Sequence, residues 1–269
     1  MEIRLKEVLA VVNNKGGVGK TTTVQSLAAA IVRQNKEARV FCVDLDPQCH
    51  LSILQGFDIS QHQQPTIYDA LRKGVSVPVY PTNRERVYIA PASQDLQDVD
   101  SDLFRQMNPK KVLQKCFGLP VDDHTGEGLT TIIESFDYVL IDCPPALSQT
   151  TFNAMTVATG LLVPVQMEGL SVNGLGNIIL AMREVQSELN PNLTLRGLLP
   201  VMVDARPKIV QDFIDYLRRA YGDHVTHTMI RRCVKMNEAQ TMQKDIYDYK
   251  PYCTTGIDYD MLCKELFAA

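Results

Sequence analysis

The chain has 269 residues, 45% hydrophobic and 22% charged, and a formal net charge of −4 at pH 7. This composition is ordinary for a globular protein and gives no global reason to expect a nucleic-acid partner. The seven cysteines form no C-x-x-C pair, which favours reduced thiols in a cytoplasm over a disulfide framework. We expect no signal peptide, because the start carries acids and runs straight into a strand pattern. The longest apolar run, residues 154–167, is too short to span a bilayer.

Short apolar runs alternate with segments of helical spacing. In chain order we predict a strand at 8–13, a helix at 22–34, a strand at 40–45, a helix at 66–73, a strand at 87–90, a helix at 109–117, a strand at 138–141, a helix at 150–158, a strand at 161–165, a helix at 172–189, a strand at 198–203 and a helix at 208–221. Residues 119–128 are predicted to be a loop. Strands that are apolar on both faces and separated by helices indicate a doubly wound, mostly parallel α/β sheet with helices on both faces. We expect one domain over residues 1–269.

The segment NNKGGVGKTTT, residues 13–23, differs at one position from the phosphate-binding pattern G-x-x-x-x-G-K-[ST]. Asn14 stands where the first glycine belongs, and asparagine enters the left-handed region more easily than most residues. The backbone of Gly16, Gly17, Val18 and Gly19 is expected to converge on phosphate oxygens at the start of a helix. Lys20 would neutralise the β- and γ-phosphates, and the Thr21 hydroxyl would ligate Mg²⁺. The alternative is a glycine-rich turn without a ligand.

Aspartates follow two of the predicted strands. Asp44 and Asp46 end the second strand, two residues apart and so on the same side of it, and Asp142 ends another strand before Pro144 and Pro145. Carboxylates there can hold metal-bound water, since Mg²⁺ keeps several waters and needs few protein ligands. Alone, each aspartate is equally explained as a turn former or helix cap. Together with the loop they predict a magnesium–nucleotide site of the P-loop NTPase kind.

Five motifs then stand in a characteristic order: KGGVGKTTT, VDLDPQ, LIDCPP, LPVMVDAR and IRRCVKMNEAQ. This set resembles the ParA/MinD family of deviant Walker-A ATPases, most closely its ParA/Soj partition branch, from about residue 7 to 266. The segment GIDYDMLCKEL also resembles that branch's last helix. The resemblance implies ATP and Mg²⁺ as cofactors and an ATP-dependent homodimer.

The resemblance also implies roles for individual residues. Lys15 would reach across the dimer to the partner subunit's phosphates, compensating developing charge as an arginine finger does. The alternative for Lys15 is a solvated surface lysine. Asp46 would orient or polarise the attacking water, and Thr22 would assist at the α-phosphate. Asp204 and Arg206 would border the base pocket, although Arg206 is equally explained as a surface charge. Asp44 and Asp142 would hold the magnesium hydration shell.

Two departures from the family pattern concern the site. Members often have PQGN after the second strand, whereas this chain has PQCH at residues 47–50. Many have IPRN late in the sequence, where this chain has IRRC at residues 230–233. The proline replaced by Arg231 lies near the adenine contact in relatives, so this departure bears on how the base is bound.

The segment 206–235 is locally basic, with seven lysines and arginines against three aspartates. A basic face on an acidic protein can bind phosphate backbones without reading sequence. In the partition branch this region lines a non-specific DNA surface that dimerisation completes. The candidate residues are Arg218, Arg219, Arg232 and Lys235. The alternative is a solvated helix face.

Three function classes follow. The first is a switch that hydrolyses ATP, binds DNA and positions it with a ParB-like partner, in the cytoplasm or on the nucleoid. The second is a MinD-like membrane-surface or DNA-independent positioning ATPase, but the tail LCKELFAA is too short and too weakly basic for a stable membrane anchor. The third is a metal-cluster carrier. Cys42, Cys49, His50 and Cys143 match no metal-site spacing, so we expect Cys42 and Cys143 in the core.

Overall fold

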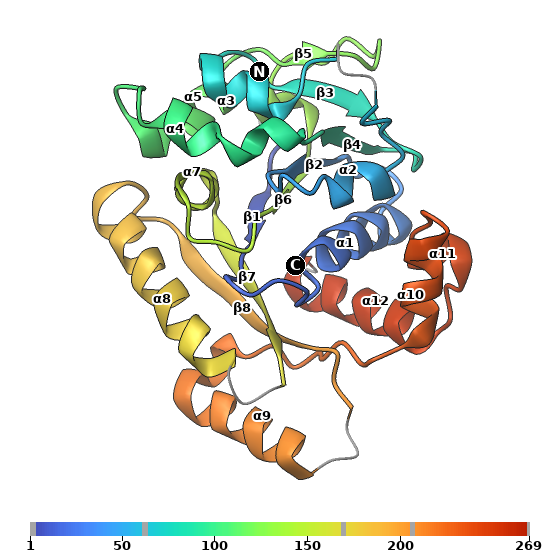
Figure 1. The fold of residues 1–269 in the computed structure, drawn as a ribbon. Coiled ribbons are helices and arrows are strands. Elements are labelled where there is room, and N and C mark those ends of the chain that lie inside the picture. The colour runs from blue at the N-terminus through green and yellow to red at the C-terminus, as the bar shows by residue number, and fades with distance from the viewer. Residues whose placement is uncertain (1–3, 61–63, 168–170, 205–207, 268–269) are drawn as a thin grey trace.

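The computed structural model describes residues 4–60, 64–167, 171–204 and 208–267, which form a central sheet between two layers of helices (Figure 1). The strands are β1 (Glu7–Val11), β2 (Val40–Asp44), β3 (Pro78–Pro81), β4 (Val87–Ala90), β5 (Asp122–Asp123), β6 (Tyr138–Asp142), β7 (Gly160–Gln166) and β8 (Thr194–Val201). They lie in the order β5-β3-β4-β2-β6-β1-β7-β8. Neighbouring strands are parallel, except that β3 and β4 are antiparallel.

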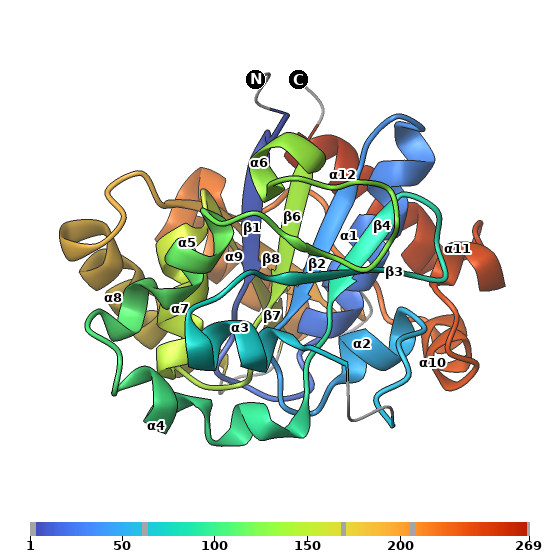
Figure 2. The same cartoon turned by 90° about the horizontal axis from the view of Figure 1, so that it is seen from above.

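Different helices cover the two faces of the sheet (Figures 1 and 2). They are α1 (Lys20–Gln34), α2 (His50–Leu54), α3 (Ile67–Lys73), α4 (Val99–Leu103), α5 (Val112–Phe117), α6 (Ile132–Ser135), α7 (Gln149–Val157), α8 (Ser171–Glu188), α9 (Lys208–Tyr221), α10 (Val234–Thr241), α11 (Ile246–Tyr249) and α12 (Thr254–Phe267). Val8 and Ala10 of β1 share a core with α3, α5, α7 and α8. Leu9 and Val11 pack with α1, α10, α11 and α12 on the other face. The predicted doubly wound α/β class is confirmed.

The six predicted strands are all present; β4 has the predicted bounds, and the ends of the other five are shifted. The largest shift is in β8, which begins at Thr194 rather than at residue 198. The loop prediction for residues 119–128 is wrong at β5, where Asp122 N–H donates to the Val77 carbonyl (2.9 Å) and His124 N–H to the Val79 carbonyl (2.9 Å). The predicted helix at 109–117 begins as a 3₁₀ turn, Pro109–Lys111, and continues as α5. The short helices α2, α4, α6, α10 and α11 were not predicted, because so few residues show little periodicity.

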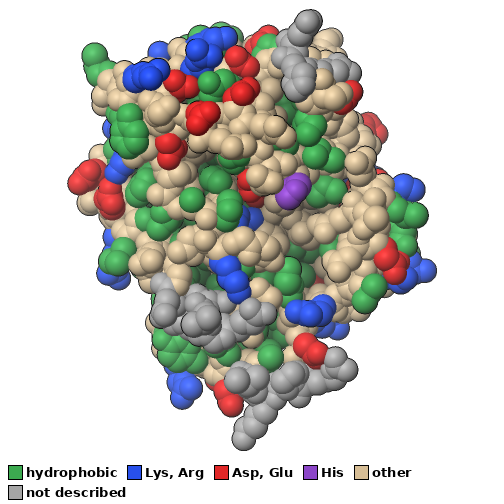
Figure 3. All heavy atoms as spheres, in the orientation of Figure 1, with side chains coloured by type: hydrophobic (Ala, Val, Ile, Leu, Met, Phe, Trp, Pro, Cys, Tyr) green, Lys and Arg blue, Asp and Glu red, His purple; other side chains and the backbone are tan. Residues whose placement is uncertain are grey.

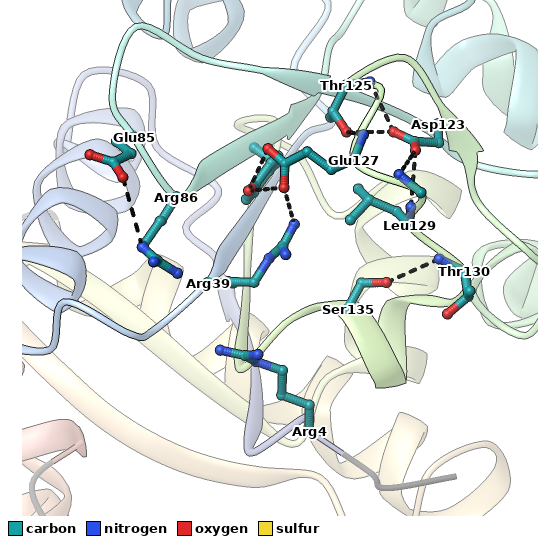
Figure 4. A network of polar contacts seen from close by, with 12 residues as sticks. Arg4, Arg39, Glu85, Arg86, Asp123, Thr125, Glu127, Leu129, Thr130 and Ser135 are labelled. Carbon is teal, nitrogen blue, oxygen red and sulfur yellow. Dashed lines mark hydrogen bonds and ion pairs between the residues drawn. The ribbon is translucent and has the colours of Figure 1, made fainter.

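Polar contacts order the amino-terminal edge of the sheet, away from the carboxyl ends of the strands (Figure 4). Arg39, which precedes β2, bonds Glu127 at 2.7 Å, and its guanidinium lies 4.9 Å from the centre of the Tyr88 ring. Asp123 accepts hydrogen bonds from Thr125, Gly128 and Leu129; the bonds from the Gly128 and Leu129 N–H groups are both 2.9 Å long. These hydrogen bonds therefore hold the connection after β5 in one conformation.

No helix within the described ranges is long and apolar enough to cross a membrane.

Candidate functional site

The loop between β1 and α1 has the backbone of a phosphate-binding loop. Gly17 and Gly19 have φ angles of 72° and 79°, in the left-handed region that glycine adopts without strain. Val18 is 1% exposed and anchors the loop in the core. Gly16 and Gly17 are exposed, so this stretch of backbone is open to an anion at the start of α1.

Asn14 does not need the left-handed conformation that we invoked to explain its presence. The non-glycine residues with positive φ in the described part of the chain are Cys49, Arg86, Met202 and Gln243. The explanation from left-handed asparagine is therefore wrong. Asn14 instead packs closely on α8, where a Cβ atom on Gly174 would lie 2.6 Å from Asn14 Oδ1. The preceding Asn13 fixes the loop by donating from Nδ2 to the Pro164 carbonyl at 2.7 Å.

Lys20 lies inside the site. Its side chain is almost wholly buried, and Nζ donates to the Lys15 carbonyl at 3.1 Å. Burial lowers the pKa of Lys20, and the carboxylates of Asp142 and Asp46 oppose that shift. A buried ammonium held by the loop's own backbone is placed to neutralise phosphate oxygens that approach the same backbone.

Asp44 and Asp142 face each other across β2 and β6 in direct register, and both are fully buried. Asp44 accepts hydrogen bonds from the Ser52 hydroxyl (2.7 Å) and N–H (2.9 Å). Neither oxygen of Asp142 has a partner with hydrogen-bond geometry among the described residues. Burial raises the pKa of Asp44 to about 6. Burial first, and then the Asp44 charge, raises the pKa of Asp142 well above its usual range, against the opposing effects of Thr21 and Lys20.

These two carboxylates fit a hydrated magnesium ion. Buried carboxylates that repel each other are stabilised when a cation or its bound water lies nearby. The described residues contain no cluster of three or more His, Cys, Asp or Glu side chains that could ligate a metal ion. That Asp44 and Asp142 act on magnesium through water stays a prediction; the half-buried Thr21 at the start of α1 lies beside Asp142.

The Asp44 pKa gives a prediction about stability. In the unfolded chain an aspartate titrates near pH ~3.9, so between about pH 4 and pH 6 the unfolded state releases a proton that folded Asp44 retains. The free energy of unfolding therefore falls as pH rises through this window, and the penalty persists above it. Asp44→Asn should make the protein more stable at pH 7.5 by about 1–3 kcal/mol, and the gain should shrink at pH 4.5. Urea unfolding without magnesium at both pH values tests this, and a less stable variant at pH 7.5 contradicts it.

Asp46 and Lys15 occupy different sides of the loop. Asp46 lines the same cavity as Lys20, and its Oδ1 accepts a hydrogen bond from Gln48 N–H at 3.0 Å. Lys15 is not among the residues that line this cavity. Its Nζ instead donates to Gln166 Oε1, at the end of β7, at 3.3 Å. The two lysines of the loop are therefore separated, one inside the site and one on its rim.

Two adjoining cavities meet at the loop. The first, of about 620 Å³, is lined by the loop glycines with Lys20, Thr21 and Asp46. The second, of about 450 Å³ and called the base cavity below, has a largely apolar wall that includes Ile230 and Tyr259. Both are lined by Gly19, Thr22, Met202 and Gln240. One continuous depression thus offers polar groups for phosphates beside an apolar wall for a planar base.

Two of the shared residues were missed from the sequence, although both stand in the motifs quoted above. Gln240 of α10 donates from Nε2 to the Thr22 hydroxyl at 2.7 Å, which joins α10 to the phosphate loop. Met202 follows β8 with φ 53°, a conformation that non-glycine residues adopt rarely. Their positions within these motifs were the available signal, but their contacts depend on elements far apart in the chain.

The structure bears differently on each of the residues discussed for the adenine base. Arg206 lies outside the described residues. Asp204 is half-buried after β8 but is not among the residues that line either cavity. Arg231, which replaces the family's proline, lines the base cavity and is held by Asp258, with 2.6 Å between Nη2 and Oδ1. Cys49, where relatives have the glycine of PQGN, has φ 55° and precedes α2.

The four candidate DNA-binding residues fall into two groups. Arg218 and Arg219 are exposed in the last turn of α9. Arg232 is exposed just before α10 and also lines the base cavity, while Lys235 of α10 pairs with Glu238 at 2.8 Å. Helices α9 and α10 lie apart in both views (Figures 1 and 2). Within one subunit, the described part of the basic segment is therefore not one helix face. Figure 3 shows positive and negative side chains interspersed over the visible surface.

Cys42 and Cys143 are fully buried in the two cores beside the sheet, as expected from the sequence.

Known proteins resemble this chain in sequence and in fold. A family model described as an AAA domain matches residues 6–195. The sporulation initiation inhibitor protein Soj of Bacillus subtilis is 31% identical, over 97% of this chain and 98% of its own. The chromosome-partitioning ATPase Soj of Thermus thermophilus is 34% identical, over 97% and 95%. A solved cobyrinic acid a,c-diamide synthase of Mycobacterium smegmatis, with bound ATP analogue and magnesium, is 30% identical, with a TM-score of 0.78 over 97% and 93%. The chain therefore belongs to the ParA/Soj-type family of ATPases.

Proposed function

We propose that this protein is an ATP-dependent dimerisation switch that binds DNA without sequence preference and positions a DNA cargo with a ParB-like partner. Its cofactors are ATP and Mg²⁺, as expected for a ParA/Soj-type ATPase and in line with the related synthase that holds an ATP analogue and magnesium. Dimerisation, partner stimulation and DNA binding are the new parts of the proposal.

The separation of the two loop lysines carries the proposal. Lys20 is buried with the carboxylates, whereas Lys15 lies on the rim and is held by Gln166. A lysine on the rim can serve a phosphate bound by a second subunit, provided that the two phosphate loops face each other. An amine supplied in this way compensates charge on the transferring phosphoryl group only in the dimer. We therefore expect weak hydrolysis by the isolated subunit.

The other site residues divide the remaining work. Lys20 and the loop backbone bind the phosphates, and Asp46 orients the attacking water from the cavity wall. Thr21, with Asp44 and Asp142 acting through water, would hold magnesium, which supplies positive charge to the phosphate oxygens when bound. Thr22, whose hydroxyl accepts a hydrogen bond from Gln240, would assist at the α-phosphate. The apolar wall of the base cavity takes the adenine.

The two-fold symmetry of the ATP dimer would let modest basic groups bind DNA. One subunit offers two small groups of cations, but a two-fold dimer presents each group twice and can engage more phosphates at once. Affinity then depends steeply on the number of contacts, with a log–log salt slope of about −0.9 per neutralised phosphate on duplex DNA. Binding that is marginal for one subunit becomes stable for the ATP dimer.

Arg232→Ala removes one cation from each subunit of the dimer, so it should weaken DNA binding equally on unrelated sequences and reduce the salt slope by about 2. Fluorescence anisotropy on two unrelated duplexes across a salt series measures both quantities. Arg105→Ala is the matched control, because Arg105 is an exposed arginine near α4 and its side chain is 80% exposed. Its DNA affinity should equal that of the wild type.

Arg232 also lines the base cavity, so ATP affinity must be measured for the same variant. Weaker DNA binding with unchanged ATP affinity supports a direct contact between Arg232 and the phosphates of DNA. An equal loss of both assigns Arg232 to the base cavity instead. If the wild-type ATP dimer has no DNA affinity even at low salt, the function becomes that of a DNA-independent positioning ATPase.

A further inference from the structure

Two of the seven cysteines form a close pair beside the base cavity. Cys233 is the N-cap residue of α10, and Cys253 directly precedes α12. The Thr255 hydroxyl, two residues after Cys253, donates to the carbonyl of Arg231, two residues before Cys233, at 3.2 Å, so the starts of α12 and α10 are in contact. The two cysteine side chains interact with each other, and both are only partly buried. Cys233 lines the base cavity, which connects it to solvent. The other five cysteines are buried.

The surroundings of Cys233 favour its thiolate. The backbone N–H groups of Lys235 and Thr255 and the Thr255 side chain favour the charged form of the Cys233 thiol. Partial burial opposes ionisation, but these groups outweigh it and lower the pKa of Cys233. Helix N-termini stabilise thiolates in this way, and the thiolate is the reactive form. Burial raises the pKa of the other five thiols, which lack this environment.

We propose that Cys233 and Cys253 are a peroxide-sensitive thiol pair whose oxidation to a disulfide narrows the base cavity and weakens nucleotide binding. The Cys233 thiolate attacks one oxygen of hydrogen peroxide, which forms a sulfenic acid and releases hydroxide. The Cys253 thiol then attacks the sulfenic sulfur, so that the disulfide forms and water leaves. Two thiols lose two electrons, and one peroxide becomes two waters.

The effect on the cavity follows from the geometry of the bond. Sulfur atoms in a disulfide lie about 2.05 Å apart, closer than two hydrogen-bonded thiols. Bond formation therefore draws the start of α10 toward the start of α12. Arg232, Cys233 and Val234 at the start of α10 line the base cavity, as does Thr255 in α12. Cytosolic disulfides are usually transient and regulatory, which suits a reversible control of this kind.

Oxidation itself is tested without nucleotide. The full-length protein is treated with hydrogen peroxide and then digested without reductant. The expected product is a peptide pair joined through Cys233 and Cys253 that dithiothreitol separates. In Cys253→Ser, a sulfenic-acid probe such as dimedone should label Cys233. Absence of the joined peptides, or preferential labelling of one of the five buried cysteines, overturns the thiol-pair assignment.

The effect of the disulfide on nucleotide binding rests on the proposed function, so it is tested separately. The Kd for Mg-ATP should rise about tenfold in oxidised wild type and return after reduction. Cys253→Ser is the matched control, because it cannot form the disulfide and Cys253 is not among the residues that line the base cavity; peroxide should lower its ATP affinity less than that of the wild type. Reduced wild type that does not bind ATP contradicts the proposed function and leaves the disulfide result standing. A disulfide that forms without changing ATP affinity overturns the proposed effect on nucleotide binding.

Discussion

Lys20→Ala is expected to abolish tight ATP binding. Lys20 is 6% exposed, and it is the lysine that lies inside the phosphate cavity, beside Asp46 and Asp142. Removing it loses a charge-assisted contact and leaves these carboxylates facing the phosphates without compensation. One such contact contributes about 1.5–3 kcal/mol, so affinity should fall at least about tenfold and, with the added repulsion, beyond a hundredfold.

Isothermal titration calorimetry with Mg-ATP measures this loss. Lys36→Ala is the matched control, since Lys36 is an exposed lysine just beyond α1, and it should bind as the wild type does. Circular dichroism on both variants verifies that they fold. Wild-type affinity in folded Lys20→Ala would disprove the assignment of the loop.

Lys15→Ala and Asp46→Ala should have opposite effects on assembly. Lys15 lies on the rim, so its loss should leave ATP affinity nearly intact but remove the ATP dimer and its hydrolysis. Asp46→Ala should accumulate the dimer, because the water is no longer oriented while the cross-subunit lysine remains. General base or water-orienting groups contribute about 10²–10⁴-fold to rate, which sets the expected loss of turnover.

Light scattering with ATP and with ADP separates these two variants. ADP provides the control, since neither variant should dimerise with it. An Asp46→Ala protein that stays monomeric with saturating ATP contradicts the dimerisation switch. A Lys15→Ala protein that dimerises and hydrolyses as the wild type does would reduce Lys15 to a surface lysine.

The parts of the site that the sequence predicts correctly are local. Glycines at 16, 17 and 19 between an apolar strand and a helix predict the loop, and Gly17 and Gly19 do adopt left-handed φ. Asp44 and Asp142 each end an apolar strand, and parallel strands end at the same edge of a sheet. That β2 and β6 are neighbours, with the two aspartates in direct register, was not predicted and comes from the structure.

The remaining features depend on contacts between distant parts of the chain. The bond from Gln240 to Thr22 spans 218 residues, so no local pattern reveals it. The pairing of β5 with β3 depends on backbone hydrogen bonds, to which the side-chain pattern of Asp122 and Asp123 gives no clue. The excess of lysine and arginine in residues 206–235 predicts one basic face, but a count along the chain does not show which side chains share a surface. The fold places the candidate residues of this segment on α9 and around α10 instead.

The central claim is that ATP occupancy controls both assembly and DNA binding. Sedimentation velocity with a fluorescent random duplex tests it most directly, using Asp46→Ala to hold the ATP state. With Mg-ATP the protein should sediment as a dimer that carries the duplex, and rising salt should release the DNA steeply. With ADP the protein should be monomeric and the duplex free. A protein that remains monomeric with ATP, or that binds the duplex equally with ADP, contradicts the account.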